Sequence, residues 1–156
     1  MKKNNLFYYL SMIAFMFIFS GGLYYTCELI YRQYSHPSMF ILAGILGVLI
    51  GFLNDTIFSY KTDFLIQVAA ATLLCVIGEG VTGIIVNKMM GLNIWDYSHS
   101  FGNFFFGQCN LFFTFVWALI SGMGIFILDH IEYKLFDFGD EEPNYHIGNK
   151  EFYRYK

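Results

Sequence analysis

The chain has 156 residues, of which 56% are hydrophobic and only 13% are charged. Soluble domains carry about 25% charged residues, so this composition excludes an ordinary soluble protein and indicates a membrane protein. The net charge is -3, and because no basic patch is present, nucleic acid is not an expected partner. The expected surrounding is the lipid bilayer, so the next question is how many apolar segments cross it.

The first apolar segment covers about residues 6–31 and follows a basic start, as the core of a signal peptide would. It is longer than such a core, so we expect a retained first span. Glu28 lies near its far end. Arg32 follows four residues later, where the two side chains can form an ion pair in a helix.

The second apolar segment, about residues 38–59, begins after a turn that Pro37 predicts. Within it, Ala43, Gly47 and Gly51 recur every four residues. Small residues at this spacing let helix backbones approach closely. We therefore expect this face to look into the bundle and to carry Asp55, which continues the same spacing.

The third apolar segment, about residues 64–88, carries an acid in its interior, Glu79. Thr62 or Asp63 is available to cap its start. An acid inside a membrane helix costs about 2.5–3.5 kcal/mol on insertion scales, so we expect Glu79 to have a functional or structural role. Two interpretations stay open: a binding or proton-handling carboxylate, and a structural one bonded to Thr82, Asn87 or a neighbouring span. The small and polar residues on the same face are Thr72, Cys75, Thr82 and Gly83.

The loop at about residues 89–107 is long and aromatic. Trp95 and Tyr97 are typical of the membrane–water interface, and Asp96 with Ser98 can close an Asx turn. The structural interpretation is an interfacial anchor with a locked turn, in a loop that dips into the mouth of the bundle. The functional alternative is a lid over the outer mouth, with Asp96 near the face that carries Glu28 and Glu79.

The fourth apolar segment, about residues 110–129, ends at Asp129, which is expected at the interface. Residues 135–156 are acidic and aromatic, so this tail is expected to be solvent-exposed and partly disordered. With the N-terminus inside, seven basic residues fall in the cytoplasm and only Arg32 and Lys88 outside. Glu28, Glu79 and Asp96 then lie toward the outer side.

These observations predict an all-α polytopic protein: a bundle of four transmembrane helices with a polar-aromatic outer loop. Residues 1–134 form the four-span domain and residues 135–156 a cytoplasmic tail. Both termini are expected in the cytoplasm and the protein in the cell membrane. His36 and His99, with Asp96 and Glu28, do not match the spacing of a metal-ligand motif. We therefore predict no metal or cofactor, and without a phosphate-binding G-x-x-x-x-G-K-[ST] motif the chain hydrolyses no nucleotide by that route.

A set of motifs carries a resemblance to a known family. The motifs are Glu79-x-x-Thr82-Gly83, then Trp95-Asp96-Tyr97-Ser98, Asn103, Cys109 and an aromatic run to Trp117. Over roughly residues 20–130 the chain resembles the bacterial family called Putative ABC-transporter type IV, or CmpB-like, and more distantly a family of small animal transmembrane proteins. The family carries an acid near the outer end of its first span, which Glu28 matches. Its upstream Gly-Trp pair is replaced here by Gly22-Leu23-Tyr24.

The resemblance implies a polytopic, permease-like membrane protein, and an ABC mechanism would require a separate ATPase chain. Our first hypothesis is therefore a permease-like or channel-like transport component. Its intramembrane carboxylates contact a cationic or polar solute, and it works as a homo-oligomer or with a partner subunit. The residues expected to bind the solute or line its polar pathway are Glu28, Asp55, Glu79, Thr82 and Asp96.

Two alternatives remain. The chain could be a structural, assembly or regulatory membrane protein without transport activity, whose tail contacts a cytoplasmic partner. It could also be an enzyme that uses Glu79 and Asp96 as acid and base, although no Ser-His pair or closely spaced carboxylates support that alternative. The substrate, the direction of movement and the partner do not follow from the sequence.

Overall fold

The computed structural model describes residues 6–138 and 142–155, and most of them lie in helices. Three helical stretches are long and apolar enough to cross a membrane. They are α1 (Leu6–Arg32), α4 (Phe64–Gly83) with its π-helical continuation η1 (Ile84–Met89), and α5 (Leu111–Phe136). The predictions for residues 1–5, 139–141 and 156 lie outside the described residues.

The second apolar segment is shorter than expected. Helix α2 (Pro37–Gly51) begins behind His36, whose ring accepts the amide of Ser38, and it ends at Gly51. A separate short turn, α3 (Leu53–Thr56), follows Phe52. The predicted helix to residue 59 is therefore wrong, and by itself α2 is shorter than the helices that can span a bilayer.

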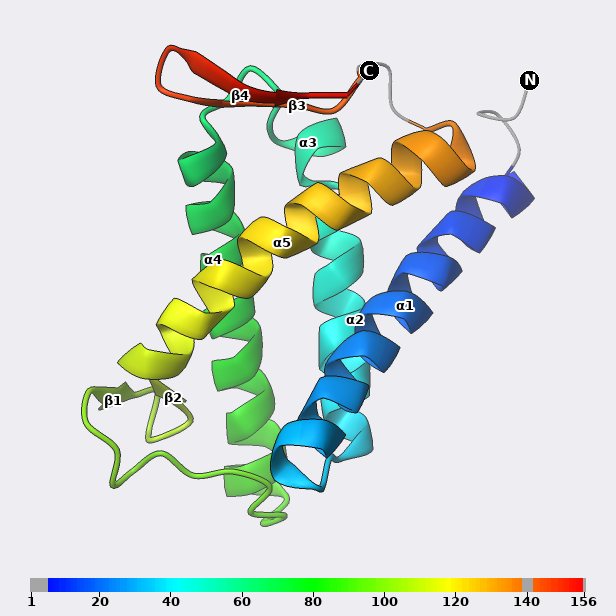
Figure 1. Cartoon of the computed structure of the whole chain (residues 1–156). Coiled ribbons are helices and arrows are strands. Elements are labelled where there is room, and N and C mark those ends of the chain that lie inside the picture. The colour runs from blue at the N-terminus through cyan, green and yellow to red at the C-terminus, as the bar shows by residue number, and fades with distance from the viewer. Residues whose placement is uncertain (1–5, 139–141, 156) are drawn as a thin grey trace.

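Short strands mark the two ends of the bundle (Figure 1). Near the start of α5, β1 (Asn103–Phe104) pairs with β2 (Cys109–Asn110) within a long loop, which we call the loop end. At the opposite end, β3 (Asn144–Ile147) and β4 (Lys150–Arg154) form an antiparallel hairpin, which we call the hairpin end. Between them α5 crosses diagonally in front of α4, and α1 and α5 diverge toward the loop end.

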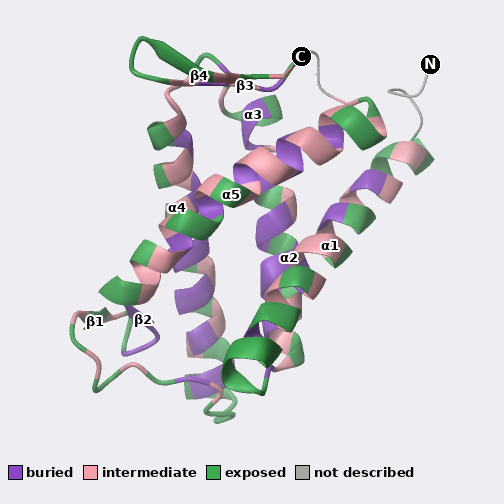
Figure 2. Cartoon of the chain, viewed as in Figure 1, coloured by how far each residue is buried: buried purple, intermediate pink, exposed green. Residues whose placement is uncertain are grey.

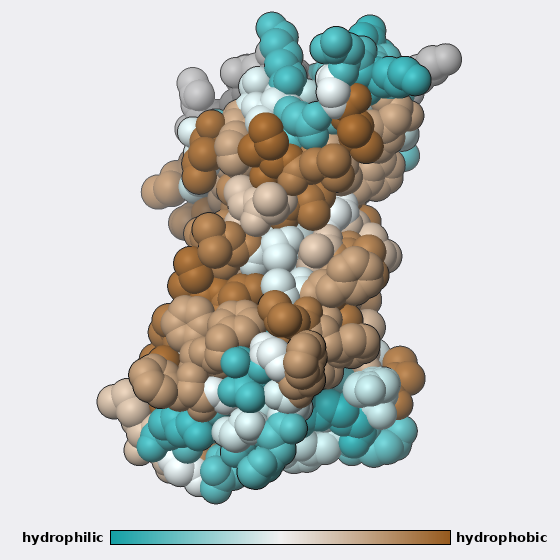
Figure 3. Space-filling view, turned by 90° about the vertical axis from the view of Figure 1, so that its left-hand side faces the viewer, coloured by the Kyte–Doolittle hydropathy of each residue, from teal (hydrophilic) through white to brown (hydrophobic). Residues whose placement is uncertain are grey.

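The surface has the layering of a membrane protein. Buried residues lie mainly on the helix faces that look toward one another (Figure 2). On the side face, a broad hydrophobic belt separates two hydrophilic ends (Figure 3). The belt agrees with the composition and with the three long helices, because apolar side chains facing outward are stable only in contact with lipid or another apolar surface.

The stripe of small residues on α2 faces α1, in agreement with its predicted position inside the bundle. A Cβ on Gly47 would overlap the side chain of Ser20, and one on Gly51 would overlap that of Met16. The expectation that the same face carries Asp55 inward is wrong, since Asp55 is exposed and its neighbour Asn54 is buried. The helix is interrupted at Phe52, so the four-residue spacing does not continue to Asp55.

Asp63 caps α4 and also connects it to the hairpin. One carboxylate oxygen accepts the amide of Leu65 at 2.8 Å, as an N-cap does. The other accepts the amide of Gly148, in the turn between β3 and β4, at 2.6 Å. The hydrogen bond from Gly148 is the main reason that the pKa of Asp63 is lowered.

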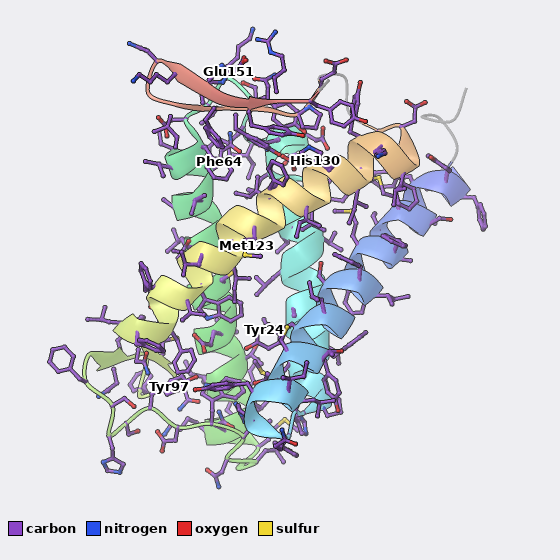
Figure 4. The ribbon with its side chains drawn as sticks, viewed as in Figure 1. Tyr24, Phe64, Tyr97, Met123, His130 and Glu151 are labelled. Atoms are coloured by element: carbon purple, nitrogen blue, oxygen red, sulfur yellow. The ribbon has the colours of Figure 1, made fainter. Side chains whose placement is uncertain are left out.

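The tail of the chain packs against the bundle instead of extending into solvent. Helix α5 continues past Asp129 to Phe136, and of the segment expected to be disordered, residues 142–155 contain the hairpin. Tyr145 on β3 is completely buried, and its ring contacts those of Phe64 and Phe126. Phe64 and His130 lie directly beneath the hairpin, and Glu151 lies on it (Figure 4). The alternation of aromatic and polar residues typical of a strand explains why the segment orders.

Candidate functional site

A cavity of about 450 Å³ lies between α1 and α5, with α2 and α4 as its floor. We call it the groove. Most of its lining is apolar, including Phe19 and Leu23 from α1, Leu46 from α2, and Ile120 from α5. Tyr24, Met123 and Tyr97 surround it from α1, α5 and the loop end (Figure 4).

Glu28 is held at the loop end of the groove by two neighbours on its own part of the chain. Its Oε1 accepts the Arg32 guanidinium at 3.1 Å, which confirms the expected ion pair, and its Oε2 accepts the hydroxyl of Ser35 at 2.6 Å. A second guanidinium nitrogen of Arg32 donates to the carbonyl of Ile94 at 3.2 Å. Arg32 therefore joins the end of α1 to the long loop.

Glu79 is buried where α4 meets α5, with only 4% of its surface exposed. Its Oε2 accepts the indole N–H of Trp117 at 3.0 Å, so of the partners expected from sequence it uses a neighbouring span and not Thr82 or Asn87. The Trp117 ring stacks on Tyr24 of α1, with ring centroids 5.5 Å apart. A chain of contacts therefore connects α4, α5 and α1 through Glu79, Trp117 and Tyr24.

The groove brings Glu28 and Glu79 together. Both line it, along with Arg32, and with both acids ionised these three groups carry one net negative charge. Water-excluding surroundings strengthen the interaction of such a charge with a ligand. The loop end of the groove therefore favours a cation. The nearby Cys109 thiol is not a nucleophile at neutral pH, because burial and then Glu79 raise its pKa to about 12.

The loop is anchored by buried polar bonds. Trp95 is buried, and its indole donates to the carbonyl of Gln108 at 3.0 Å. Asn87, in the π-helical turn η1, donates to the Gln108 side chain at 2.8 Å and accepts the Ile94 amide at 2.7 Å. The prediction that the loop dips into the bundle mouth agrees with these contacts.

Tyr97 and Asp96 lie on different sides of this loop. Tyr97 lines the groove and stacks on Phe113, with centroids 5.0 Å apart. Asp96 is exposed and is not among the residues that line the groove. Its Oδ1 accepts the Ser98 amide at 2.8 Å, so the predicted Asx turn is present. The enzyme alternative needs Asp96 and Glu79 at one site, and this arrangement does not favour it.

The remaining predicted site residues also fall outside the groove lining. Thr82 is half-buried on α4, and Asp55 is exposed near the hairpin end. Asp55 shares a hydrogen bond with Glu132 of α5. A polar pathway through all five predicted residues is therefore not what the structure brings together.

A second polar cluster, at the hairpin end, was missed from the sequence. Asp129 was expected at the interface, but it is 1% exposed and accepts the Asn54 amide and the Tyr145 hydroxyl on one oxygen, at 2.7 and 2.8 Å. Glu132 is also buried, three residues further along α5. The spacing of the two acids on one helical face was a usable signal, but only if α5 was extended past residue 129.

The Asx turn predicts a pH dependence. Hydrogen bonds from Ser98 lower the pKa of Asp96, so its stabilising contribution is present above the unfolded pKa of about 3.9 and is lost as the pH falls through the folded pKa. We expect Asp96→Asn to melt at a lower temperature than the wild type at pH 5–7, with the difference vanishing in more acidic buffer. A difference that persists below pH 2.5 would contradict this role for the ionised carboxylate.

Comparison with known proteins adds one finding. A family model described as Putative ABC-transporter type IV matches residues 13–145. The matched region runs from within α1 to β3 and so includes the groove, the loop end and the polar cluster at the hairpin end. Comparison with curated proteins and with solved structures gave no match.

Proposed function

Since this chain belongs to the Putative ABC-transporter type IV family, we propose that it is a permease-like transport component whose groove binds a cationic solute at Glu28 and Glu79. The observation that carries the proposal is that these carboxylates, from two different helices, line one cavity. A buried acid is costly in a membrane helix, and a cationic ligand would offset part of that cost.

The proposed membrane arrangement has four crossings. Helix α2 runs beside α1 and α4 between the two ends of the bundle (Figure 1). Helix α2 alone rises about 22 Å, so the crossing of the roughly 30 Å hydrocarbon layer that we propose uses α2 together with the short helix α3 that follows it. We place the loop end outside and the hairpin end in the cytoplasm of the cell membrane, because most basic residues then lie inside. Residues 135–156 are then a cytoplasmic segment.

The proposed partner follows from the family and from the size of the chain. An ABC-type cycle needs an ATPase, and this sequence has no phosphate-binding loop of the G-x-x-x-x-G-K-[ST] type. A separate ATPase subunit would therefore act at the cytoplasmic side. Four helices enclose only a narrow space, so a homo-oligomer is the other arrangement that this function allows.

The test measures cation binding to purified protein. Tryptophan fluorescence reports on the groove because Trp117 bonds Glu79 directly. Tetramethylammonium is expected to change the fluorescence of the wild type with saturation. In Glu79→Gln the dissociation constant should rise by about 10- to 100-fold, as expected when a bond involving a charged group is lost.

The matched control is Asp96→Asn, which removes an exposed acid that does not line the groove. It should bind tetramethylammonium like the wild type. Equal weakening in both variants would mean that overall charge, and not the groove, attracts the cation. Uptake of the same cation into proteoliposomes that remains unchanged in Glu79→Gln would remove the carboxylate from the transport proposal.

The assembly alternative has one observation in its favour. The bond from Trp117 to Glu79 joins α5 to α4, which is how a structural acid holds helices together. Under this alternative, Glu79→Gln and Trp117→Phe both lower the yield of folded protein, and the wild type binds no cation. The fluorescence titration and the yield together decide between the two functions.

A further inference from the structure

The groove has two compartments with different chemistry. Its loop end holds Glu28, Glu79 and Arg32. From Trp117 to Leu128, a distance of about 16 Å along α5, the lining is almost entirely aliphatic or aromatic. A hydrated ion would lose its water there without finding polar partners, which is costly. The apolar compartment instead matches a hydrocarbon chain.

Aromatic pairs bridge α1 and α5 on both sides of this apolar compartment. Near the hairpin end, the rings of Phe15 and Phe136 are 5.6 Å apart. Near the loop end, Tyr24 stacks on Trp117. Between these bridges the two helices are not joined by such a pair among the described residues, and we call this interval the window.

The rim of the window is apolar and exposed. Leu23 of α1 is 51% exposed, and Met123 of α5 is 64% exposed. Both line the groove, so the groove opens between α1 and α5 at an apolar part of the flank of the bundle. A molecule dissolved in the bilayer can therefore reach the groove without crossing either hydrophilic end.

The polar compartment selects the head group. Beside its two carboxylates it presents the aromatic rings of Tyr24, Tyr97 and Trp117. Aromatic faces next to acids attract alkylated ammonium groups, which are held by cation–π contacts as well as by charge. An anionic head would be opposed by the net negative charge.

We propose that the groove binds a single-chain amphiphile with an alkylammonium head. The molecule enters sideways from the bilayer through the window, with its chain along α5 and its head against Glu79. This inference rests on the proposed function and specifies its substrate class. The charge of the polar compartment, the apolar lining and the exposed rim each support the same occupant.

Native mass spectrometry of the full chain, released from a neutral detergent, tests the proposal with two cations. Dodecyltrimethylammonium should bind at least tenfold more tightly than tetramethylammonium, because only the former fills the apolar compartment. Dodecyl sulfate, with the same chain and an anionic head, should bind at least tenfold more weakly than dodecyltrimethylammonium. Glu79→Gln should weaken the binding of both cations.

Two neighbouring residues on α5 provide a matched pair of variants. Both are exposed, but only Ile120 lines the groove, and Leu119 is not among the lining residues. Ile120→Trp should reduce the affinity for dodecyltrimethylammonium to the level of tetramethylammonium and leave the latter unchanged. Leu119→Trp should leave both affinities unchanged.

The outcomes separate this inference from the function on which it rests. If the long-chain cation binds no more tightly than tetramethylammonium, while both depend on Glu79, the amphiphile is excluded and the cation site stands. If neither cation binds, both proposals fail. If dodecyl sulfate binds as tightly as dodecyltrimethylammonium, the proposed alkylammonium head group is wrong. If the wild type is a dimer that Ile120→Trp converts to a monomer, the window is the contact site for a second copy of the chain, and the amphiphile is excluded from it.

Discussion

Tyr145→Ala is expected to lower the free energy of unfolding by about 3–5 kcal/mol, the range for removing a buried aromatic side chain. Tyr145 is completely buried, and its hydroxyl donates to Asp129 at 2.8 Å, beside the Asn54 amide, which donates to the same oxygen at 2.7 Å. Burial, and then Asp129, raise the pKa of Tyr145 well above its ordinary value, so the hydroxyl remains a donor. Thermal melting in detergent, followed by tryptophan fluorescence, measures the effect.

Two further variants divide this effect into its causes. Tyr145→Phe keeps the ring and removes the donor, so it should cost about 1–3 kcal/mol, as expected when a buried acceptor loses a partner. Phe152 lies on the same hairpin but is half exposed. Phe152→Ala should therefore lower the free energy of unfolding by less than half as much as Tyr145→Ala does. If Tyr145→Ala melts like Phe152→Ala, the hairpin is not packed on the bundle as described.

The second large effect concerns the contact between α1 and α2. A Cβ on Gly21 would lie 2.6 Å from the backbone carbonyl oxygen of Phe40. The backbone of Phe40 cannot rotate away from this Cβ as a side chain could, so α1 and α2 would have to move apart. Gly21→Ala is therefore expected to cost about 1–3 kcal/mol, as overpacked cores do, and to lower the yield of monodisperse protein in size-exclusion chromatography.

The adjacent glycine is the control. A Cβ on Gly22 would have a ring carbon of Phe40 as its nearest neighbour, 4.0 Å away, which is an ordinary contact. Gly22→Ala should be neutral or should stabilise α1 slightly, because alanine favours helix over glycine. Equal losses in the two variants would point to backbone flexibility of α1, and not to its close approach to α2, as the cause.

Sequence patterns located the features that depend on local composition. The three long apolar stretches became α1, α4 with η1, and α5. The Glu28–Arg32 pair, the Asp63 cap and the Asp96–Ser98 turn are each made by residues at most four positions apart. Such contacts follow from the geometry of one helical turn or one tight turn, so a single sequence is enough to predict them.

The errors occurred where distant parts of the chain decide the outcome. Asp129 resembled the end of a membrane helix because it is charged, but its burial depends on Asn54, 75 positions earlier, and on Tyr145, 16 positions later. The partner of Glu79, Trp117, lies 38 positions away. A cavity beside Glu79 follows from one interpretation of this acid, but the apolar lining of the groove was not predicted, because it cannot be distinguished from an ordinary core until the crossing of α1 and α5 is known.

The contact between Tyr145 and Asp129 also has a consequence for how the protein is made. Synthesis proceeds at about 5–20 residues per second, so Asp129 exists for about one second or longer before Tyr145, 16 positions later, has been added. During that interval Asp129 is still inside the ribosome, whereas Asn54, made 75 positions earlier, has already left it. Asn54 and Tyr145 have therefore both been synthesised when Asp129 leaves the ribosome, so α5 can insert without a stage in which this carboxylate waits for a partner that has not yet been made.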